Sequence, residues 1–282
     1  MKVSVVFAVY NRAGYVTECI DSIFAQTLQD FEIIAADDCS EDNTLEVLRS
    51  IAAKDSRVKV LSNPRHRFIE TLNVAMSMAS GEYIARIDSD DTMLPKRLQR
   101  QVECMDADPT VAVCCSWYDT FGDCHAKGNH ISGRIIRPYY RLLMGNFLAN
   151  PTSMIRKSFL DEHHLCYQEE NIYSEDYKLW TDITRLGGAI YVIPEILTRY
   201  RIHEGQLSRK YAQIQEESAF KAQMDALNDI VEKLSREDVY IEPLFEQLAS
   251  FNERGLLSTE AIVRICYEIA ESGARQTVYE SY

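Results

Sequence analysis

Short apolar segments alternate with amphipathic helical segments up to residue 87, and this alternation constrains the fold more strongly than any other feature of the chain. The apolar segments have the length and apolar content of strands, while the segments between them repeat apolar residues at helical spacing. We expect strands at 3–9, 32–36, 58–61 and 83–87, and helices at 16–26, 44–53 and 69–79. Because strand–helix–strand units wind right-handedly into parallel sheets, the sequence predicts an α/β, Rossmann-type fold with a mostly parallel central sheet flanked by helices.

The chain has 282 residues, enough for one large α/β core and an appended element. From residue 211 onward it is rich in Glu, Ala, Leu, Ile and Gln at helical spacing, so we expect a first domain at 1–210 and a helical C-terminal extension at 211–282. The formal net charge of -13, without a run of Lys and Arg, argues against nucleic acid as a partner. The first residues lack the pattern of a secretion signal, and no apolar run could span a bilayer, so a cytoplasmic location is expected.

Acidic residues gather where two of the predicted strands end. Asp37 and Asp38 follow the strand at 32–36, and Asp88-Ser89-Asp90-Asp91 follows the strand at 83–87. Ligands of parallel sheets bind at the carboxyl ends of the strands, and carboxylate oxygens suit Mg²⁺ or Mn²⁺. We therefore predict a divalent metal site with Asp90 as ligand and Asp88 in support. The alternative is an Asx-rich turn that caps the helix after Pro95.

Several separated segments carry a family resemblance in a fixed order. SVVFAVYNRAGYVTECIDSIFAQT, EIIAADDCSEDNT, GEYIARIDSDD, SEDYKLW and YRIHEGQLSRKY together resemble the signature of inverting family-two glycosyltransferases with the GT-A fold, over about the first three-quarters of the chain. Within that family, NPRHRF, GEYIARIDSDD, SEDYKLW and RYRIHEGQLSRKY are most similar to bacterial lipooligosaccharide β-1,3-N-acetylglucosaminyltransferases. The resemblance implies that residues 1–210 are a GT-A catalytic domain.

The predicted donor is a nucleotide sugar. Asp38 is placed to accept the imide N–H of uracil, which cytosine lacks, so UDP is favoured over CMP. The resemblance implies that the backbone of residues 8–10 packs against the base and that Arg67 approaches the nucleotide, although a solvated Arg67 is an equal alternative. The residues expected to bind the nucleotide sugar are Ala8, Val9, Tyr10, Asp38, Arg67, Asp88, Ser89 and Asp90.

The resemblance adds His203 as a second metal ligand, whereas a lone histidine is more often a structural hydrogen-bonding residue. It also assigns the catalytic base to Asp176, with Glu175 orienting it or binding the acceptor. Acidic residues that open a helix have an ordinary explanation in the helix dipole. Trp180, one turn further on, offers a sugar-stacking face for the acceptor or fills the core.

These expectations combine into a metal-dependent, inverting transferase. It would move a sugar, GlcNAc first among the choices, from a UDP-sugar to a hydroxyl of an oligosaccharide or lipid-linked glycan in bacterial surface glycan synthesis. A lipid carrier would bring the enzyme to the inner membrane as a peripheral protein, and the extension could support a homodimer. The rivals are a galactosyl- or other hexosyltransferase, a silent nucleotide-sugar-binding module, and a dinucleotide oxidoreductase. The last is set aside because AVYNRAGY lacks the GxGxxG pattern.

Overall fold

The computed structural model describes residues 1–128, 131–236, 248–250, 252–255, 258, 261–262 and 264–265. Its strands are β1 (Val3–Val9), β2 (Phe31–Asp37), β3 (Val58–Ser62), β4 (Tyr83–Arg86), β5 (Thr92–Met93), β6 (Val111–Gly122), β7 (Lys127–Gly128), β8 (Gly133–Arg134), β9 (Met154–Arg156) and β10 (Ala189–Ile202). Its helices are α1 (Val16–Phe24), α2 (Thr44–Ala52), α3 (Phe68–Ser77), α4 (Arg97–Ala107), α5 (Pro138–Leu142), α6 (Lys157–His163), α7 (Glu175–Arg185), α8 (Leu207–Lys210) and α9 (Ala212–Arg236), with short 3₁₀ helices η1 (Asn150–Thr152) and η2 (Glu169–Asn171).

The strands form one sheet in the order β3-β2-β1-β4-β9-β6-β10-β5. The pairs β1–β2, β2–β3, β1–β4 and β6–β10 are parallel, whereas β9 pairs antiparallel with both β4 and β6. This confirms the predicted α/β fold with a mostly parallel sheet. The strand order reverses between β1 and β4, because the chain leaves β1 toward β2 and β3 and then returns to the other side of β1. Ligands of open α/β sheets bind at such a switch point.

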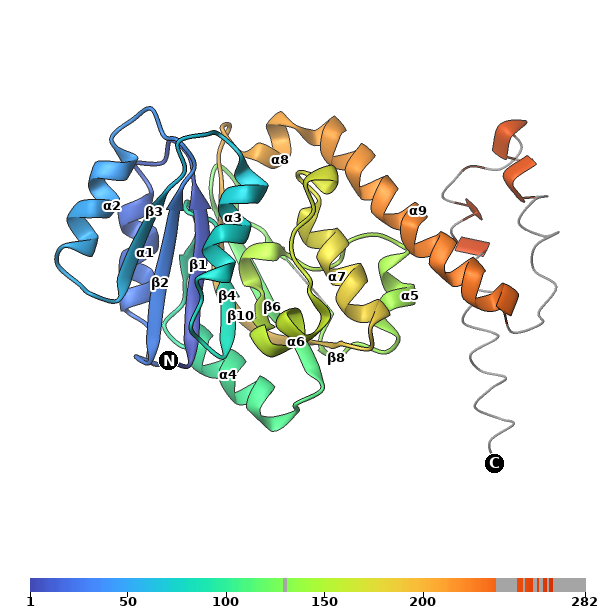
Figure 1. Ribbon diagram of the computed structural model, residues 1–282, viewed down its shortest axis with the longest axis horizontal. Coiled ribbons are helices and arrows are strands. Elements are labelled where there is room, and N and C mark those ends of the chain that lie inside the picture. The colour runs from blue at the N-terminus through green and yellow to red at the C-terminus, as the bar shows by residue number, and fades with distance from the viewer. Residues whose placement is uncertain are drawn as a thin grey trace.

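Successive side chains of β1 point to opposite faces of the sheet, and this explains why helices cover both faces. Val5 and Phe7 point to a core shared with α1, α2 and α4, whereas Val6 points to a second core shared with α3, α6 and α7. Figure 1 shows α1 and α2 on one face of the sheet and α3 on the other. Successive side chains of a strand point to opposite faces, so a strand that is apolar on both faces is covered on both.

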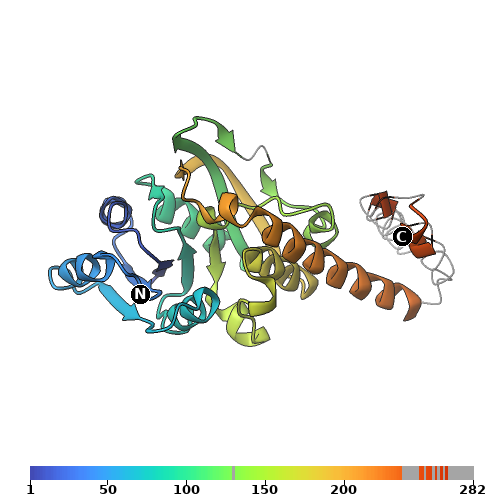
Figure 2. The same ribbon diagram turned by 90° about the horizontal axis from the view of Figure 1, so that it is seen from above.

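The long helix α9 lies outside these two layers. It packs along α7 and α5, where Tyr139 and Leu143 form a third apolar cluster with Ala226 and Leu227. Figure 2 shows α9 extending past the rest of the fold from this contact. The predicted helical extension is therefore present as α9, and the remaining part of that prediction lies mainly outside the described residues. No helix in the described ranges is both long and apolar enough to cross a membrane.

Two arginines are buried where β4 meets α4. Arg86 and Arg97 are 1% and 0% exposed. The Arg97 guanidinium donates to the carbonyl of Arg86 at 2.6 Å and to the carbonyl of Ser153 at 3.2 Å, so it joins the ends of β4 and β9. Gln101, one turn along α4, accepts from Arg97 Nε at 3.1 Å and donates to the carbonyls of Cys114 and Thr152. A buried cation of this kind stabilises a fold only while its partners remain.

We predict that Arg97→Met lowers the free energy of unfolding by about 3 kcal/mol, because it leaves buried carbonyls and the carboxylate of Asp91 without a compensating cation. Urea unfolding at neutral pH measures this loss. The control is Arg100→Met on the same helix, where the side chain is 42% exposed and pairs with Glu195 and Glu103. That change should cost less than about 1 kcal/mol. Equal losses for the two variants would contradict the role given to Arg97.

Candidate functional site

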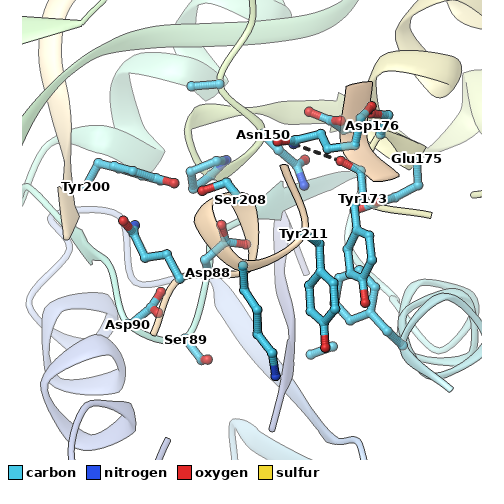
Figure 3. A pocket seen from close by; sticks show the side chains of 18 of the residues that line it. Asp88, Ser89, Asp90, Asn150, Tyr173, Glu175, Asp176, Tyr200, Ser208 and Tyr211 are labelled. Atoms are coloured by element: carbon cyan, nitrogen blue, oxygen red, sulfur yellow. Dashed lines mark hydrogen bonds between the residues drawn. The ribbon is translucent and has the colours of Figure 1, made fainter. Parts of the chain in front are cut away.

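A cavity of about 820 Å³ opens at the carboxyl ends of β1, β2 and β4. The strand ends form one wall, and α7, α8 and the start of α9 form the opposite wall. Figure 3 shows Asp88, Ser89 and Asp90 on one side of this cavity, and Glu175 and Asp176 on the other. The predicted site residues that line it are Ala8, Val9, Tyr10, Asp38, Asp88, Ser89, Asp90, Glu175 and Asp176.

Asp38 is fixed by hydrogen bonds at one end of the cavity. Its Oδ1 accepts from the backbone N–H of Arg67 at 2.9 Å and from Thr71 Oγ1 at 2.6 Å. The side chain is 1% exposed, and its position next to the end of β2 follows from the parallel register that pairs Val9 with Asp37. The carboxylate therefore stays in one orientation beside the backbone of Val9 and Tyr10.

The Arg67 side chain, expected to approach the nucleotide, does not line the cavity. Arg67 precedes α3, and its guanidinium points to solvent and lies 3.6 Å from Glu70. The neighbouring residue His66 occupies the cavity wall instead, with Nδ1 2.8 Å from Asp38 Oδ2 and its ring 4.2 Å from the ring of Tyr10. The segment Pro64-Arg65-His66-Arg67 indicated a basic residue near the nucleotide. Its spacing did not indicate that the histidine, and not an arginine, lines the cavity.

The acidic turn after β4 is held by β10. The backbone N–H of Asp91 donates to the carbonyl of Asp88 at 3.0 Å, and Asp91 Oδ1 accepts from the backbone of Arg201 at 2.8 Å. Arg201 Nε also donates to the carbonyl of Asp90 at 2.8 Å. Helix α4 begins at Arg97 with Lys96 as N-cap and no side-chain cap, so the alternative that this turn caps the helix is wrong.

The turn concentrates negative charge in a buried place. Burial, together with the charges of Asp90 and Asp176, raises the pKa of Asp88 to about 6. Burial, together with the charges of Asp88 and Asp90, also raises the pKa of Asp91 well above its usual range. A site of this kind favours a bound cation, which would lower the electrostatic cost of ionising these groups.

Asp90 and His203 form a hydrogen-bonded pair, and the backbone N–H of Gly205 donates to His203 Nδ1 at 3.1 Å, so His203 has the structural role given above as the alternative. The same spacing also suits two ligands of one metal ion. Asp90 Oδ2 is 3.0 Å from His203 Nε2 and 3.2 Å from Arg12 Nε. Two adjacent ligands of an octahedral ion with bonds of about 2.1 Å are separated by roughly 3 Å, so the pair fits Mg²⁺ or Mn²⁺. Arg12 would have to yield its contact to such an ion. His203 stacks on Tyr15 behind Asp90, with ring centroids 5.4 Å apart.

In the part of the chain that the structure describes, no three His, Cys, Asp or Glu side chains are gathered for a metal ion. Magnesium sites that serve nucleotides commonly use one or two protein carboxylates and complete their shell with phosphates and water. The donor set of Asp90 and His203 is therefore compatible with a cation shared with a diphosphate. It is not compatible with a closed site built from protein alone.

Glu175 and Asp176 occupy the first turn of α7. Asp176 Oδ2 accepts from Asn146 Nδ2 at 3.2 Å, and its Oδ1 accepts from the backbone N–H of Tyr177 at 2.7 Å. Glu175 is 6% exposed, and its Oε2 has no hydrogen-bond partner in the described residues. Burial raises the pKa of Asp176 to about 6, and burial together with the charge of Asp176 raises the pKa of Glu175 to about 8. The pKa of Glu175 is thus raised further than that of Asp176, so Glu175 keeps its proton to higher pH.

Trp180 does not offer a face to the acceptor. It is 0% exposed and packs in the core with Tyr177, Ile183 and Leu179 from its own helix. Trp180 lies one helical turn beyond Asp176 on α7, where the helix is covered by the core and no longer borders the cavity. The expectation of sugar stacking is therefore wrong, and the alternative that Trp180 fills the core is correct.

The wall opposite the strand ends includes residues that lie beyond the expected boundary at residue 210. Tyr211, Gln215 and Ala219 line the cavity from the start of α9. The extension therefore contributes to the site, and a division at residue 210 cuts through the cavity wall. Periodicity predicted the helix, but it gave no information on where the helix packs.

Residues 4–164 match the family model described as Glycosyl transferase family 2. Over 243 residues the chain is 32% identical to an uncharacterized glycosyltransferase of Haemophilus influenzae, an alignment that covers 82% of this chain and 75% of that protein. Over 237 residues it is 27% identical to UDP-Glc:alpha-D-GlcNAc-diphosphoundecaprenol beta-1,3-glucosyltransferase WfgD of Escherichia coli, covering 82% and 87% of the two chains.

Two solved structures share the fold. TarS 1-349 of S. aureus in complex with UDP-GlcNAc matches with a TM-score of 0.70 at 21% identity, covering 82% of this chain and 67% of that chain. The mannosyltransferase PcManGT from Pyrobaculum calidifontis, in complex with GDP-Man and Mn²⁺, matches with a TM-score of 0.58 at 17% identity, covering 100% and 88%. These similarities confirm the predicted GT-A-like α/β fold.

The raised pKa of Glu175 makes stability depend on pH. Because the folded state binds this proton more tightly than the unfolded state, the free energy of unfolding falls as pH rises from about 4.5 to about 8. We expect Glu175→Gln to reduce the fall between pH 5 and pH 8 by on the order of 2 kcal/mol in urea unfolding. The control is Glu170→Gln, at an exposed position, for which the free energy of unfolding should fall between pH 5 and pH 8 as much as in the unmodified protein. If Glu175→Gln shows the full fall as well, Glu175 is not a buried acid.

Proposed function

The chain belongs to glycosyl transferase family 2, and from this premise we propose that it is a metal-dependent, inverting enzyme that uses a UDP-sugar, most favourably UDP-GlcNAc. The acceptor is a hydroxyl group of an oligosaccharide or lipid-linked glycan of the bacterial surface. The observation that carries this proposal is the position of Asp176, which faces the acidic turn of Asp88 and Asp90 across one cavity.

The nucleobase end of the cavity supports UDP as the carrier. Asp38 is a buried carboxylate whose Oδ1 is held by two hydrogen bonds, which leaves Oδ2 as the proposed acceptor of a uracil imide N–H once His66 moves from its place 2.8 Å away. Tyr10 lies beside it, with His66 against its ring. The complex of TarS with UDP-GlcNAc and the donor named for WfgD both favour a uridine nucleotide.

At the other end of the diphosphate, Asp90 and His203 are the proposed metal ligands, and Ser89 and Asp88 are the proposed neighbours of the nucleotide sugar. A bound Mg²⁺ or Mn²⁺ would neutralise the charge that develops on the leaving diphosphate. Arg12 Nε lies 3.2 Å from Asp90 Oδ2. Once a metal ion binds to Asp90 and His203, the Arg12 side chain can turn from this carboxylate to the diphosphate. The Mn²⁺ named with PcManGT supports a metal at this end.

Asp176 is the proposed base. In an inverting transfer the acceptor oxygen attacks the anomeric carbon from the face opposite the diphosphate, its proton passes to the carboxylate, and the bond from carbon to phosphate oxygen breaks with its electron pair on UDP. Asn146 orients Oδ2 of Asp176 through its amide. Glu175, protonated at neutral pH, can hydrogen-bond an acceptor hydroxyl without competing for that proton.

A glucose donor is the second candidate, favoured by the name of WfgD. The lipid-linked acceptor in that name also supports a peripheral association with the cytoplasmic face of the inner membrane, and α9 offers a surface for a homodimer. A silent module that only binds the nucleotide would need no base opposite the donor.

We predict that Asp176→Asn lowers the rate of sugar transfer by about a hundredfold or more while UDP binding stays unchanged, because only proton removal is lost. Initial rates of UDP release with an acceptor present give the first quantity, and calorimetry gives the second. In the unmodified protein the rate should fall as pH drops below about 6. The control variant Asp161→Asn, at an exposed position, should transfer the sugar at the rate of the unmodified protein. Full activity of Asp176→Asn would remove Asp176 from the role of base.

Calorimetric titration with UDP, CMP and NAD, first with Mn²⁺ and then with EDTA, tests the donor. We expect UDP binding that depends on Mn²⁺, no comparable binding of CMP or NAD, and a loss of the Mn²⁺ effect in Asp90→Ala. The exposed Asp30→Ala should bind as the unmodified protein does. NAD binding would favour an oxidoreductase, and absence of UDP binding in both conditions would overturn the proposed donor.

A further inference from the structure

Two tyrosines form a stacked pair beside the acidic residues of α7. The rings of Tyr173 and Tyr211 have centroids 4.4 Å apart and planes inclined by 7°. Tyr173 lies two residues before Glu175, and Tyr211 lies between α8 and α9. Figure 3 shows both rings on the side of Glu175 and Asp176, away from Asp90. Both side chains line the cavity and are only partly buried, so the pair presents aromatic surface to its interior.

Packing of the core does not account for this pair. Neither ring belongs to any of the three apolar clusters formed by the described residues. The ammonium of Lys210 lies over the ring of Tyr211, 5.1 Å from its centroid, so the remaining neighbour of the pair is a polar group. Aromatic surface kept at a cavity wall, outside the core, is typical of binding sites.

The fold holds Tyr173 in an unfavourable backbone conformation. Its φ angle is +66°, in the left-handed region that bulky side chains rarely adopt. Gln215 Nε2 donates to the carbonyl of Tyr173 at 2.9 Å, and Ser174 Oγ donates to the carbonyl of Gln215 at 2.8 Å. These bonds tie the residue to the first turns of α9. Backbone strain of this kind persists where surrounding contacts enforce it, and it is concentrated at functional sites.

We propose that the Tyr173–Tyr211 pair is the platform for the acceptor sugar, binding the C–H face of a terminal pyranose and directing one of its hydroxyls to Asp176. This inference rests on the proposed function. A pyranose such as β-galactose gathers C–H groups on one face, which are attracted to an aromatic π surface, while its hydroxyls point to the ring edge. Glu175, which also lines the cavity, has a buried Oε2 without a hydrogen-bond partner in the described residues.

The position of the pair fits this assignment better than a role in donor binding. The proposed donor contacts come from the ends of β1, β2 and β4, whereas Tyr173 and Tyr211 come from the opposite wall. Only two residues, Ser174 and Glu175, separate Tyr173 from Asp176 in the chain, so a sugar resting on the Tyr173 ring lies within reach of the carboxylate. The same short connection lets α9 position the platform and the base together.

Saturation-transfer NMR without any donor tests the platform directly. The probes are lactose, cellobiose and chitobiose, which end in β-galactose, β-glucose and β-GlcNAc. We expect saturation of the C–H protons of the terminal ring for at least one probe, strongly reduced in Tyr211→Ala and in Tyr173→Asn. Asparagine is chosen because it tolerates the left-handed backbone. Tyr211→Trp should retain the signal, since it keeps an aromatic face.

Steady-state kinetics with UDP-GlcNAc, Mn²⁺ and the bound probe supply the second readout. Loss of one stacking face should raise the KM for the sugar by about three- to tenfold, with the affinity for UDP unchanged. Tyr140→Ala is the matched control, because Tyr140 also belongs to a tyrosine pair beside α9 but does not line the cavity.

The outcomes separate this inference from the proposed function. UDP binding by the unmodified protein, with no sugar signal or with equal signals in Tyr211→Ala and Tyr140→Ala, overturns the platform and leaves the donor proposal standing. A sugar signal that depends on Tyr211, without UDP binding, supports the platform and overturns the donor. Loss of the signal in Tyr140→Ala as well would assign the effect to displacement of α9, and would also overturn the platform.

Discussion

The buried arginines beneath the acidic turn are the constraint on which the rest of the site depends. Arg86 and Arg97 lie almost fully inside the protein, and Arg97 bonds the end of β4 to the start of β9. Burial alone would push the carboxyl groups of Asp88, Glu175 and Asp176 toward their neutral forms, and the charge of Arg86 opposes this at each of them. An acid cluster without such cations would carry an uncompensated desolvation cost. The acidic residues of the cavity can therefore be buried together because the positive charge of Arg86, on β4, partly compensates them.

This arrangement gives two adjacent carboxyl groups different electrostatic environments, on which their proposed roles as base and hydrogen-bond donor rest. Asp176 has hydrogen bonds from Asn146 and from the backbone of Tyr177, which favour its ionised form. Glu175 has an orphaned oxygen and lies next to the charge of Asp176, so it retains its proton to higher pH. Neighbouring acids whose environments separate their pKa values in this way supply a base and a hydrogen-bond donor from consecutive residues.

The sequence predicted the parts of the molecule that are encoded locally. The strands and helices up to residue 87 follow from periodicity, and Asp38 and Asp90 are at strand ends because parallel strands deliver their following residues to one edge. The antiparallel β9 between β4 and β6 could not be predicted, since its pairing depends on distant segments. Trp180 was misjudged for a related reason, because a tryptophan on an amphipathic helix gives no indication of which side faces a cavity. His66 was missed since its contact with Asp38 joins two loops far apart in the sequence.

The two walls of the cavity are under different constraints. The donor wall consists of strand ends fixed by the sheet register and by Arg97, so a change there disturbs the core. The opposite wall is built from the first turns of α7 and α9. Tyr177 in this wall belongs to the core, whereas Tyr173 and Tyr211 lie outside every apolar cluster of the described residues. Substitutions of Tyr173 and Tyr211 therefore cost little core packing energy and, on the proposed platform, change which sugar can rest against it. A chain built this way can retain its donor chemistry while the acceptor changes, because specificity for the acceptor depends on side chains that the core does not need.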